Sequence, residues 1–181
     1  KIMWQHYYEE KFDYSPIPSL ENLQIYGYFQ SEKYFQHCKS IIRDYFTLKS
    51  EYKSNVTNEC SIHVRRGDYV NLPNHHPTLS LNQYYIPAIN LLTNVDNVTN
   101  FTVYSDDIEW CKNQFNTASG NFTYVSGNTI EDFAGMINSK HNIIANSSFS
   151  WWAAWLNPNP NKVVVAPKTW FGPAYYYHNT K

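Results

Sequence analysis

Residues 61–70 have the sequence SIHVRRGDYV, which combines a strand signal with an anion-binding signal. The first four residues, SIHV, have the character of a short buried strand, and Arg65, Arg66, Gly67 and Asp68 follow them directly. Arginine offers planar, permanently charged donors suited to bidentate phosphate contacts, and glycine leaves room for close approach. The stretch therefore predicts a strand that ends at an anion-binding edge.

Strand-like and helix-like segments alternate around this stretch. Short apolar runs predict strands at 60–65, 101–104, 122–125, 142–145 and 162–166. Apolar spacings of three and four predict helices at 32–48, 81–92, 107–115, 130–138 and 148–156. Ser31 is the expected N-cap of the first helix, and Pro87 predicts a kink or break in the second. Five strands separated by helices predict an α/β fold with a Rossmann-like, mostly parallel sheet.

Three of the predicted strand ends carry groups suited to an anionic ligand. They are RRGD at 65–68, SDD at 105–107 and NSS at 146–148, the last of which precedes a helix. In parallel sheets ligands bind beyond the carboxyl ends of the strands, and free N–H groups at a helix start attract anions. Such an edge favours a phosphorylated or nucleotide ligand, although neither GxxxxGK[ST] nor GxGxxG occurs in the sequence.

Each of these signals also has a purely structural interpretation. The two arginines can pair with Asp106, Asp107 or Glu109 in a network that braces the loops. Ser147 and Ser148 can act as ordinary N-cap residues, which need no ligand. Both interpretations stay open at the level of sequence.

Composition excludes several classes of protein. Hydrophobic residues make up 43% of 181 residues and the formal net charge is −1, which predicts a globular domain rather than a disordered segment or a polybasic nucleic-acid binder. No apolar run approaches the ~18 residues of a membrane span. Cys38, Cys60 and Cys111 lack CxxC or Cys/His ligand spacing, which argues against a disulfide scaffold and a zinc site. A reduced compartment is the simpler expectation.

Longer blocks carry a family resemblance. HVRRGDY at 63–69, VYSDDIEWCK at 103–112 and EDFAGMINSKHNIIANSSFSWWAAWL at 131–156 resemble conserved blocks of the α-1,2-fucosyltransferases, glycosyltransferase family 11. YGYFQSEKYF, from about Gly27, and APKTWFG at 166–172 also fit, whereas the family's glycine-rich amino-terminal half has no counterpart. The resemblance implies the nucleotide-sugar-binding half of a GT-B glycosyltransferase. It divides the chain into an upstream and interdomain remnant at 1–30 and a GDP-fucose-binding domain at 31–181.

The resemblance also implies six donor-binding residues: His63, Arg65, Arg66, Asp132, Ser147 and Ser148. Arg65 would hold the diphosphate, where negative charge grows as GDP departs, and Arg66 would help or brace the loop. Asp132 would accept hydrogen bonds from the guanine edge, although an acid in the first turn of a helix also favours the helix dipole. The two serines would complete the phosphate cradle.

The implied reaction is the inverting transfer of L-fucose from GDP-fucose to a galactoside hydroxyl in α-1,2 linkage. Such a displacement benefits from a base near the acceptor hydroxyl. The candidate catalytic residues are Arg65 and Asp68, although Asp68 can instead hold Arg66 or Tyr69. The family is similar to metal-independent enzymes, so Asp106 and Asp107 are expected to bind no metal.

Other aromatic and titratable residues have less specific interpretations. His75 and His76 follow the first strand and are expected to be solvent-exposed loop residues rather than acceptor contacts. Trp151, Trp152 and Trp155 could offer a sugar-stacking face, but their spacing inside an apolar block predicts that at least two belong to the core.

A second class of function competes with the enzyme. Because 181 residues leave no room for a full second Rossmann-like domain, the chain could be a non-catalytic nucleotide-sugar or glycan-binding module. The expected partners are GDP-fucose and a galactose-terminated glycan, with no nucleic acid. The expected location is the bacterial cytoplasm, with peripheral membrane association, and the alternative is the Golgi lumen.

Overall fold

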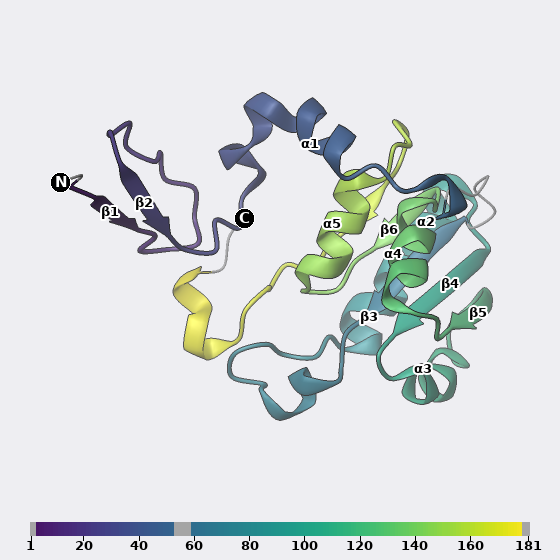
Figure 1. Ribbon diagram of the computed structural model, residues 1–181. Coiled ribbons are helices and arrows are strands. Elements are labelled where there is room, and N and C mark those ends of the chain that lie inside the picture. Colours follow the sequence, from purple (N-terminus) through teal and green to yellow (C-terminus); the bar gives the residue numbers. More distant parts are fainter. Residues whose placement is uncertain (1–2, 53–58, 179–181) are drawn as a thin grey trace.

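A computed structural model describes residues 3–52 and 59–178 and contains a five-stranded parallel sheet (Figure 1). Its strands are β3 (Cys60–Val64), β4 (Asn100–Ser105), β5 (Asn121–Val125), β6 (His141–Ile143) and β7 (Val164–Val165), in the spatial order β5-β4-β3-β6-β7. The chain first adds β4 and β5 on one side of β3 and then crosses to add β6 and β7 on the other. The topology reverses between β3 and β6, and in such sheets this point borders the ligand crevice. The predicted α/β class and parallel sheet are confirmed.

Helices cover both faces of the sheet. One core cluster joins α2 (Ile86–Asp96) and α3 (Ile108–Phe115) to side chains of β3 and β4, among them Val103. A second cluster joins Tyr104 to α4 (Thr129–Ile137) and α5 (Ser148–Leu156). Val103 and Tyr104 are neighbours on β4, and successive strand residues point to opposite faces. Figure 1 shows α4 and α5 side by side in front of the sheet.

The central strand β3 is buried along its whole length. A parallel strand covered by helices on both faces loses contact with water on both sides, which explains its apolar character. Its one hydroxyl is satisfied, because the Asn142 amide donates to Ser61 Oγ at 2.7 Å. Asn157 in turn donates to Asn142 Oδ1 at 2.8 Å. This buried polar chain fixes β6 against β3 beneath α5.

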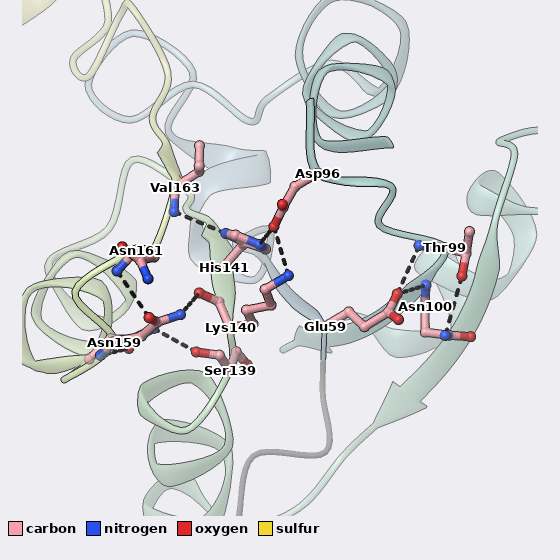
Figure 2. A network of polar contacts seen from close by, with 11 residues as sticks. Glu59, Asp96, Thr99, Asn100, Ser139, Lys140, His141, Asn159, Asn161 and Val163 are labelled. Atoms are coloured by element: carbon pink, nitrogen blue, oxygen red, sulfur yellow. Dashed lines mark hydrogen bonds and ion pairs between the residues drawn. The ribbon is translucent and has the colours of Figure 1, made fainter. Parts of the chain in front are cut away.

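A polar network connects the amino-terminal ends of the strands, opposite the edge at which the sequence predicts a ligand (Figure 2). The Glu59 carboxylate accepts from the backbone N–H groups of Thr99 and Asn100, each at 2.8 Å. Buried His141 contacts Asp96 at 2.6 Å through Nε2 and accepts from the Val163 N–H at 3.0 Å through Nδ1. These contacts connect the starts of β3, β4 and β6 to the end of α2 and to the strand after α5.

The helix predicted at 32–48 is wrong as one continuous element. The structure has two 3₁₀ turns, Glu32–Tyr34 and Gln36–Cys38, followed by the short helix α1 (Lys39–Tyr45), and none of them contains a buried residue. Ser31 does cap the first turn, because its Oγ accepts from the Lys33 N–H at 3.4 Å. The amphipathic pattern forms no long helix because the segment covers no face of the sheet and leaves Tyr45 84% exposed.

The kink or break predicted at Pro87 is observed only as a change of helix type, because the chain stays helical from Leu81 to Asp96. A π-helical turn, Leu81–Tyr85, precedes α2, and Pro87 lies in the first turn of α2, where its missing N–H loses no hydrogen bond. The strands predicted at 142–145 and 162–166 are shorter in the structure, and β6 begins one residue earlier. Both strands, β6 and β7, lie to one side of the central strand β3, where fewer residues of neighbouring strands pair.

Residues 3–30 belong to the segment that the sequence analysis separated from the main domain, but they contain two strands that it did not predict. These strands are the parallel pair β1 (Gln5–Tyr8) and β2 (Leu23–Tyr26), which Figure 1 shows apart from the main sheet. No residue between 3 and 30 is buried. The rings of Tyr8 and Tyr26 stack at 4.8 Å but stay exposed. No described helix has the length and apolar character required to cross a membrane, and all three cysteines are free thiols.

Candidate active site

A cavity of about 420 Å³ lies at the carboxyl ends of β3, β4 and β5, against the starts of α4 and α5. Four of the predicted donor-binding residues line it, namely His63, Arg65, Asp132 and Ser147. These residues are up to 84 positions apart in the sequence, and the parallel sheet brings them together because all of its strands end at one edge. The volume is within the range of small-molecule sites, ~300–1,000 Å³.

Arg65 lies in the cavity wall and is held by two carboxylates. Its Nη2 contacts Asp68 Oδ1 at 2.5 Å and its Nη1 contacts Asp106 Oδ2 at 3.0 Å. The side chain is 35% exposed, and its guanidinium lies 5.4 Å from the centre of the Tyr69 ring. The arginine is thus both part of the cavity wall and a member of the carboxylate network that the sequence left open.

Arg66 does not line the cavity and instead holds neighbouring turns together. Its Nε donates to Asp107 Oδ2 at 3.0 Å, and its guanidinium stacks 4.0 Å from the centre of the Trp110 ring. Its backbone N–H donates to Asp106 at 2.9 Å, which closes the turn after β3 against the turn after β4. Gly67 permits this closure, because a Cβ there would lie 2.6 Å from Asp106 Oδ2.

His63 is a buried cavity residue with a ring nitrogen that is unpaired in the described part of the chain. The side chain is 6% exposed, and its ring lies 5.6 Å from that of Phe149 at the start of α5. Its Nδ1 has no hydrogen-bond partner among the described residues. Burial lowers the pKa of the imidazole to about 4, with a smaller lowering from Arg65 and an opposing effect of Asp106. The ring is therefore neutral at physiological pH.

Asp132 projects from the first turn of α4 toward the cavity. Its Oδ1 accepts from the Gly127 N–H at 3.2 Å. Partial burial raises the pKa of the carboxyl, and nearby Glu131 adds to the rise, while the hydrogen bond from Gly127 opposes it. Capping of α4 is done by other groups, since Asn128 accepts from the backbone and Glu131 completes a capping box. The Asp132 carboxylate is left to face the cavity.

Ser147 and Ser148, at the start of α5, line two different cavities. Ser147 is the N-cap residue, but in the described chain its hydroxyl makes no capping hydrogen bond, and it lines the cavity. The simple capping role is therefore not observed for Ser147. Ser148 is exposed and lines a second cavity of about 580 Å³ instead. The structure does not bring Ser148 into the same cavity as the other candidates.

Sequence reasoning missed one wall of the cavity. Ser126, Gly127 and Thr129 follow β5 and line it together with Phe149. The available signal was the polar run SGNT directly after an apolar strand, since β5 ends at the same edge as β3 and β4. Asp68 stays outside the cavity wall, is 56% exposed and pairs with Arg65 rather than with Arg66 or Tyr69.

Two further predictions from the sequence need correction. His75 and His76 are half-buried rather than solvent-exposed, because His76 stacks on Tyr69 at 4.9 Å and burial lowers its pKa, with His75 adding to the effect. The tryptophans are also not fully buried. Trp152 and Trp155 pack against the second core cluster, but all three, Trp151 included, stay half-buried beside the segment that precedes α1.

The five-stranded parallel sheet, with a polar cavity at its carboxyl edge, has the fold of one half of a GT-B glycosyltransferase. POFUT1, solved in complex with GDP-fucose, shares this fold with a TM-score of 0.52 at 11% identity, over 81% of this chain and 54% of that chain. The model of Glycosyl transferase family 11 matches residues 1–178, and the chain belongs to this family.

Two curated relatives come from Escherichia coli. The chain is 41% identical over 166 residues to an alpha-1,2-colitosyltransferase and 33% identical over 167 residues to the O-antigen biosynthesis glycosyltransferase WbnK. The alignments cover 83% and 81% of this chain but 57% and 55% of the relatives. The chain thus spans little more than half the length of the curated relatives it matches.

Proposed function

We propose that the chain is the donor-binding part of an enzyme that transfers L-fucose from GDP-fucose to a galactoside hydroxyl in α-1,2 linkage, with inversion and without a metal ion. One observation carries the proposal. A single cavity at the topological switch point combines a fixed guanidinium, a carboxylate, a serine at a helix start and a histidine whose buried Nδ1 has no partner among the described residues. Family membership supports the class of reaction.

The chemistry of each group suits one part of the donor. A carboxylate such as Asp132 accepts from the N1–H and N2–H donors of guanine, which uracil does not reproduce. Arg65, with Ser147 and the free N–H groups of α5, supplies donors for a diphosphate. Because negative charge develops on the departing GDP, these donors stabilise the transition state more than the ground state.

Colitose is a second candidate for the transferred sugar. The relative that is 41% identical to this chain is named an alpha-1,2-colitosyltransferase. Colitose is L-fucose without its 3-hydroxyl, so a GDP-linked form would offer the same nucleotide to the same cavity. Parallel transfer assays with GDP-fucose and GDP-colitose on a β-galactoside decide between the sugars. Nucleotide binding without transfer or hydrolysis of either donor, also with the upstream region restored, would favour the non-catalytic module.

The first prediction separates Asp132 from Asp68. Asp132→Ala removes the acceptor for two guanine donors, so GDP binding should weaken by roughly 1.5–3 kcal/mol while weak UDP binding stays unchanged. Asp68→Asn keeps the shape and a neutral contact to Arg65, so GDP affinity should change little while transfer falls about a hundredfold through loss of the base. Calorimetric titrations beside transfer assays measure both effects.

Two results would contradict these roles. Normal GDP binding by Asp132→Ala would show that Asp132 does not bind the guanine base. A loss of GDP affinity in Asp68→Asn as large as that in Asp132→Ala would show that Asp68 serves only to hold Arg65. In that case the base has to come from another residue.

The second prediction concerns metal ions. Asp106 and Asp107, the acidic pair beside the cavity, already form ion pairs with Arg65 and Arg66. Cations of the protein itself therefore occupy these carboxylates, and excess EDTA should leave the transfer rate unchanged. Added Mg²⁺ or Mn²⁺ should raise it less than about twofold. A rate that returns only when metal is added would assign the two aspartates as metal ligands.

A further inference from the structure

The second cavity, of about 580 Å³, is built from three separate segments. The segment before α1 contributes Tyr28 and Glu32, the start of α5 contributes Ser148 and Trp151, and the loop after β7 contributes Ala166 and Trp170. The cavity is larger than the first one and shares no lining residue with it.

The lining combines aromatic faces with scattered polar groups. Several rings, Trp151 among them, alternate with hydroxyl, amide, carboxylate and ammonium groups, and the one acid, Glu32, is balanced by the one base, Lys33. A small-molecule site of this kind uses its rings for contact area and its few polar groups for orientation. A neutral saccharide has matching chemistry, because its C–H faces pack on rings and its hydroxyls both donate and accept hydrogen bonds.

The aromatic wall is already fixed in position. The Trp151 ring lies edge-on to Trp152 at 5.1 Å and parallel to Trp155 at 6.4 Å. Trp155 donates through Nε1 to the Glu32 carboxylate at 3.0 Å, which fastens the segment before α1 onto α5. A ligand that enters the cavity therefore meets side chains whose conformations are restricted beforehand, and this lowers the entropy cost of binding.

The linings of the two cavities come within one residue of each other at the start of α5. Ser147 lines the first and Ser148 lines the second, and consecutive Cα atoms are ~3.8 Å apart. Glycosyl transfer requires donor and acceptor sites to adjoin in this way. From this adjacency and the lining we infer that the second cavity binds the acceptor saccharide, a neutral glycan that ends in galactose. The inference rests on the proposed function for the direction of transfer.

The proposed transfer forms one bond and breaks one bond, and each group involved has a destination. The acceptor hydroxyl oxygen forms a bond to the anomeric carbon of the donor sugar, and the bond from that carbon to the diphosphate oxygen breaks. The electron pair of the broken bond leaves with GDP, and the hydroxyl proton passes to a base, the role proposed above for Asp68, which lines neither cavity but pairs with Arg65 in the wall of the first.

The test measures sugar and nucleotide binding separately on the 181-residue chain. Methyl β-D-galactopyranoside and lactose are the saccharide probes, and saturation-transfer NMR and tryptophan fluorescence detect their binding. GDP binding is measured by calorimetric titration. Trp151→Ala removes a ring of the wall, and Ala166→Trp fills the cavity from an exposed loop position. Tyr45→Ala is the matched control, because Tyr45 is an exposed aromatic residue on α1 that does not line the cavity.

The expected result is that both saccharides bind and that each cavity variant weakens them at least about tenfold, the effect of losing one aromatic contact. Tyr45→Ala should bind them like wild type, and GDP affinity should stay within about twofold in all three variants. If Trp151→Ala fails to fold, Ala166→Trp carries the same comparison.

The outcomes separate this inference from the proposed donor site. Normal GDP binding with no saccharide binding, or with saccharide binding that neither cavity variant changes, overturns the acceptor cavity and leaves the donor site standing. Saccharide binding that depends on Trp151 and Ala166 supports the acceptor cavity even where GDP fails to bind, a result that would overturn the donor proposal alone.

Discussion

His63 occupies an unusual position for a histidine, inside the central strand with one ring nitrogen unsatisfied. A buried polar atom left without a partner costs about 1–3 kcal/mol, so its retention in an otherwise satisfied strand points to a ligand that completes it. A neutral imidazole can accept or donate through Nδ1, depending on its tautomer. His63 lines the first cavity together with Arg65, so a ligand there would lie close to the ring.

The low pKa of His63 predicts a defined loss of stability in acid. In the unfolded chain the imidazole takes up a proton near pH 6.5, whereas in the folded chain it does so only near pH 4. The stabilising effect of the neutral ring is therefore complete above pH 6.5 and is lost as the pH falls toward 4. Between pH 7.5 and 5.0 the wild type should lose about 2 kcal/mol of unfolding free energy more than His63→Gln.

Urea denaturation at the two pH values measures this difference. His6→Gln, which removes an exposed histidine from β1, is the control and should keep the pH dependence of the wild type. If wild type and His63→Gln lose equal stability on acidification, His63 does not stay neutral in the folded protein.

At the scale of the element, α4 and α5 start differently although both point toward the cavity. In α4 the Asn128 side chain accepts from two backbone N–H groups and Glu131 completes the capping box. In α5 the backbone of Ser147 has the extended conformation of an N-cap residue, but the described side chains supply no cap. The free N–H groups of α5 are thus available to a ligand, whereas those of α4 are used by the protein.

This contrast predicts opposite effects of two alanine substitutions. Asn128→Ala should cost about 1 kcal/mol of stability, the usual value for a lost N-cap, and leave Asp132 in the first turn of α4. Ser147→Ala should cost less than about 0.5 kcal/mol and weaken GDP binding severalfold. Thermal denaturation and GDP titration of both variants measure the two effects. A stability loss in Ser147→Ala equal to that in Asn128→Ala would identify Ser147 as a structural cap.

The sequence predicted the elements of the sheet well because each strand is a short apolar run between polar turns. It failed at 32–48, where the spacing of apolar residues describes an amphipathic helix but the fold offers that face no sheet to pack on. It also missed β1 and β2, which lack a buried face and hence the alternation that marks a strand. Hydrophobic pattern predicts an element only where burial provides its stability.

The candidate site was predictable where residues follow strands directly. Arg65 and Ser147 lie at strand ends and were found, and Asp132 came from the family resemblance alone. The position of Ser148 in the second cavity could not be predicted, because one residue of helix rotation, about 100°, decides which cavity a side chain faces. The pairing of Arg65 with Asp68 likewise depends on the geometry of the turn after β3, which cannot be predicted from the spacing of residues in the motif.

At the scale of the whole molecule, the described chain has two parts of unequal burial. The main sheet contains two core clusters, whereas residues 3–30 include no buried side chain. A two-stranded sheet without a covered face is only marginally stable. The backbone N–H groups of β1 and β2 should therefore exchange with deuterium at least about a hundredfold faster than those of β3 and β4.

Hydrogen exchange measured by mass spectrometry tests this difference. Peptides from α1 serve as an internal comparison, because α1 is also exposed but is held against α5. Equal protection of β2 and β3 would show that the unit at 3–30 is stabilised as strongly as the main sheet.

If the first cavity binds GDP as proposed, the carboxylates around Arg65 would also affect how the nucleotide product is released. A guanidinium that already holds Asp68 and Asp106 gains less from an arriving diphosphate than a bare one, because the new anion must displace partners of the same charge. The same two carboxylates stand ready to recapture the arginine when the nucleotide leaves. Under the proposed function, Arg65 would exchange its carboxylate partners for the diphosphate and take them back afterwards. Such an exchange would keep the affinity for GDP moderate and favour rapid turnover where product release limits the rate.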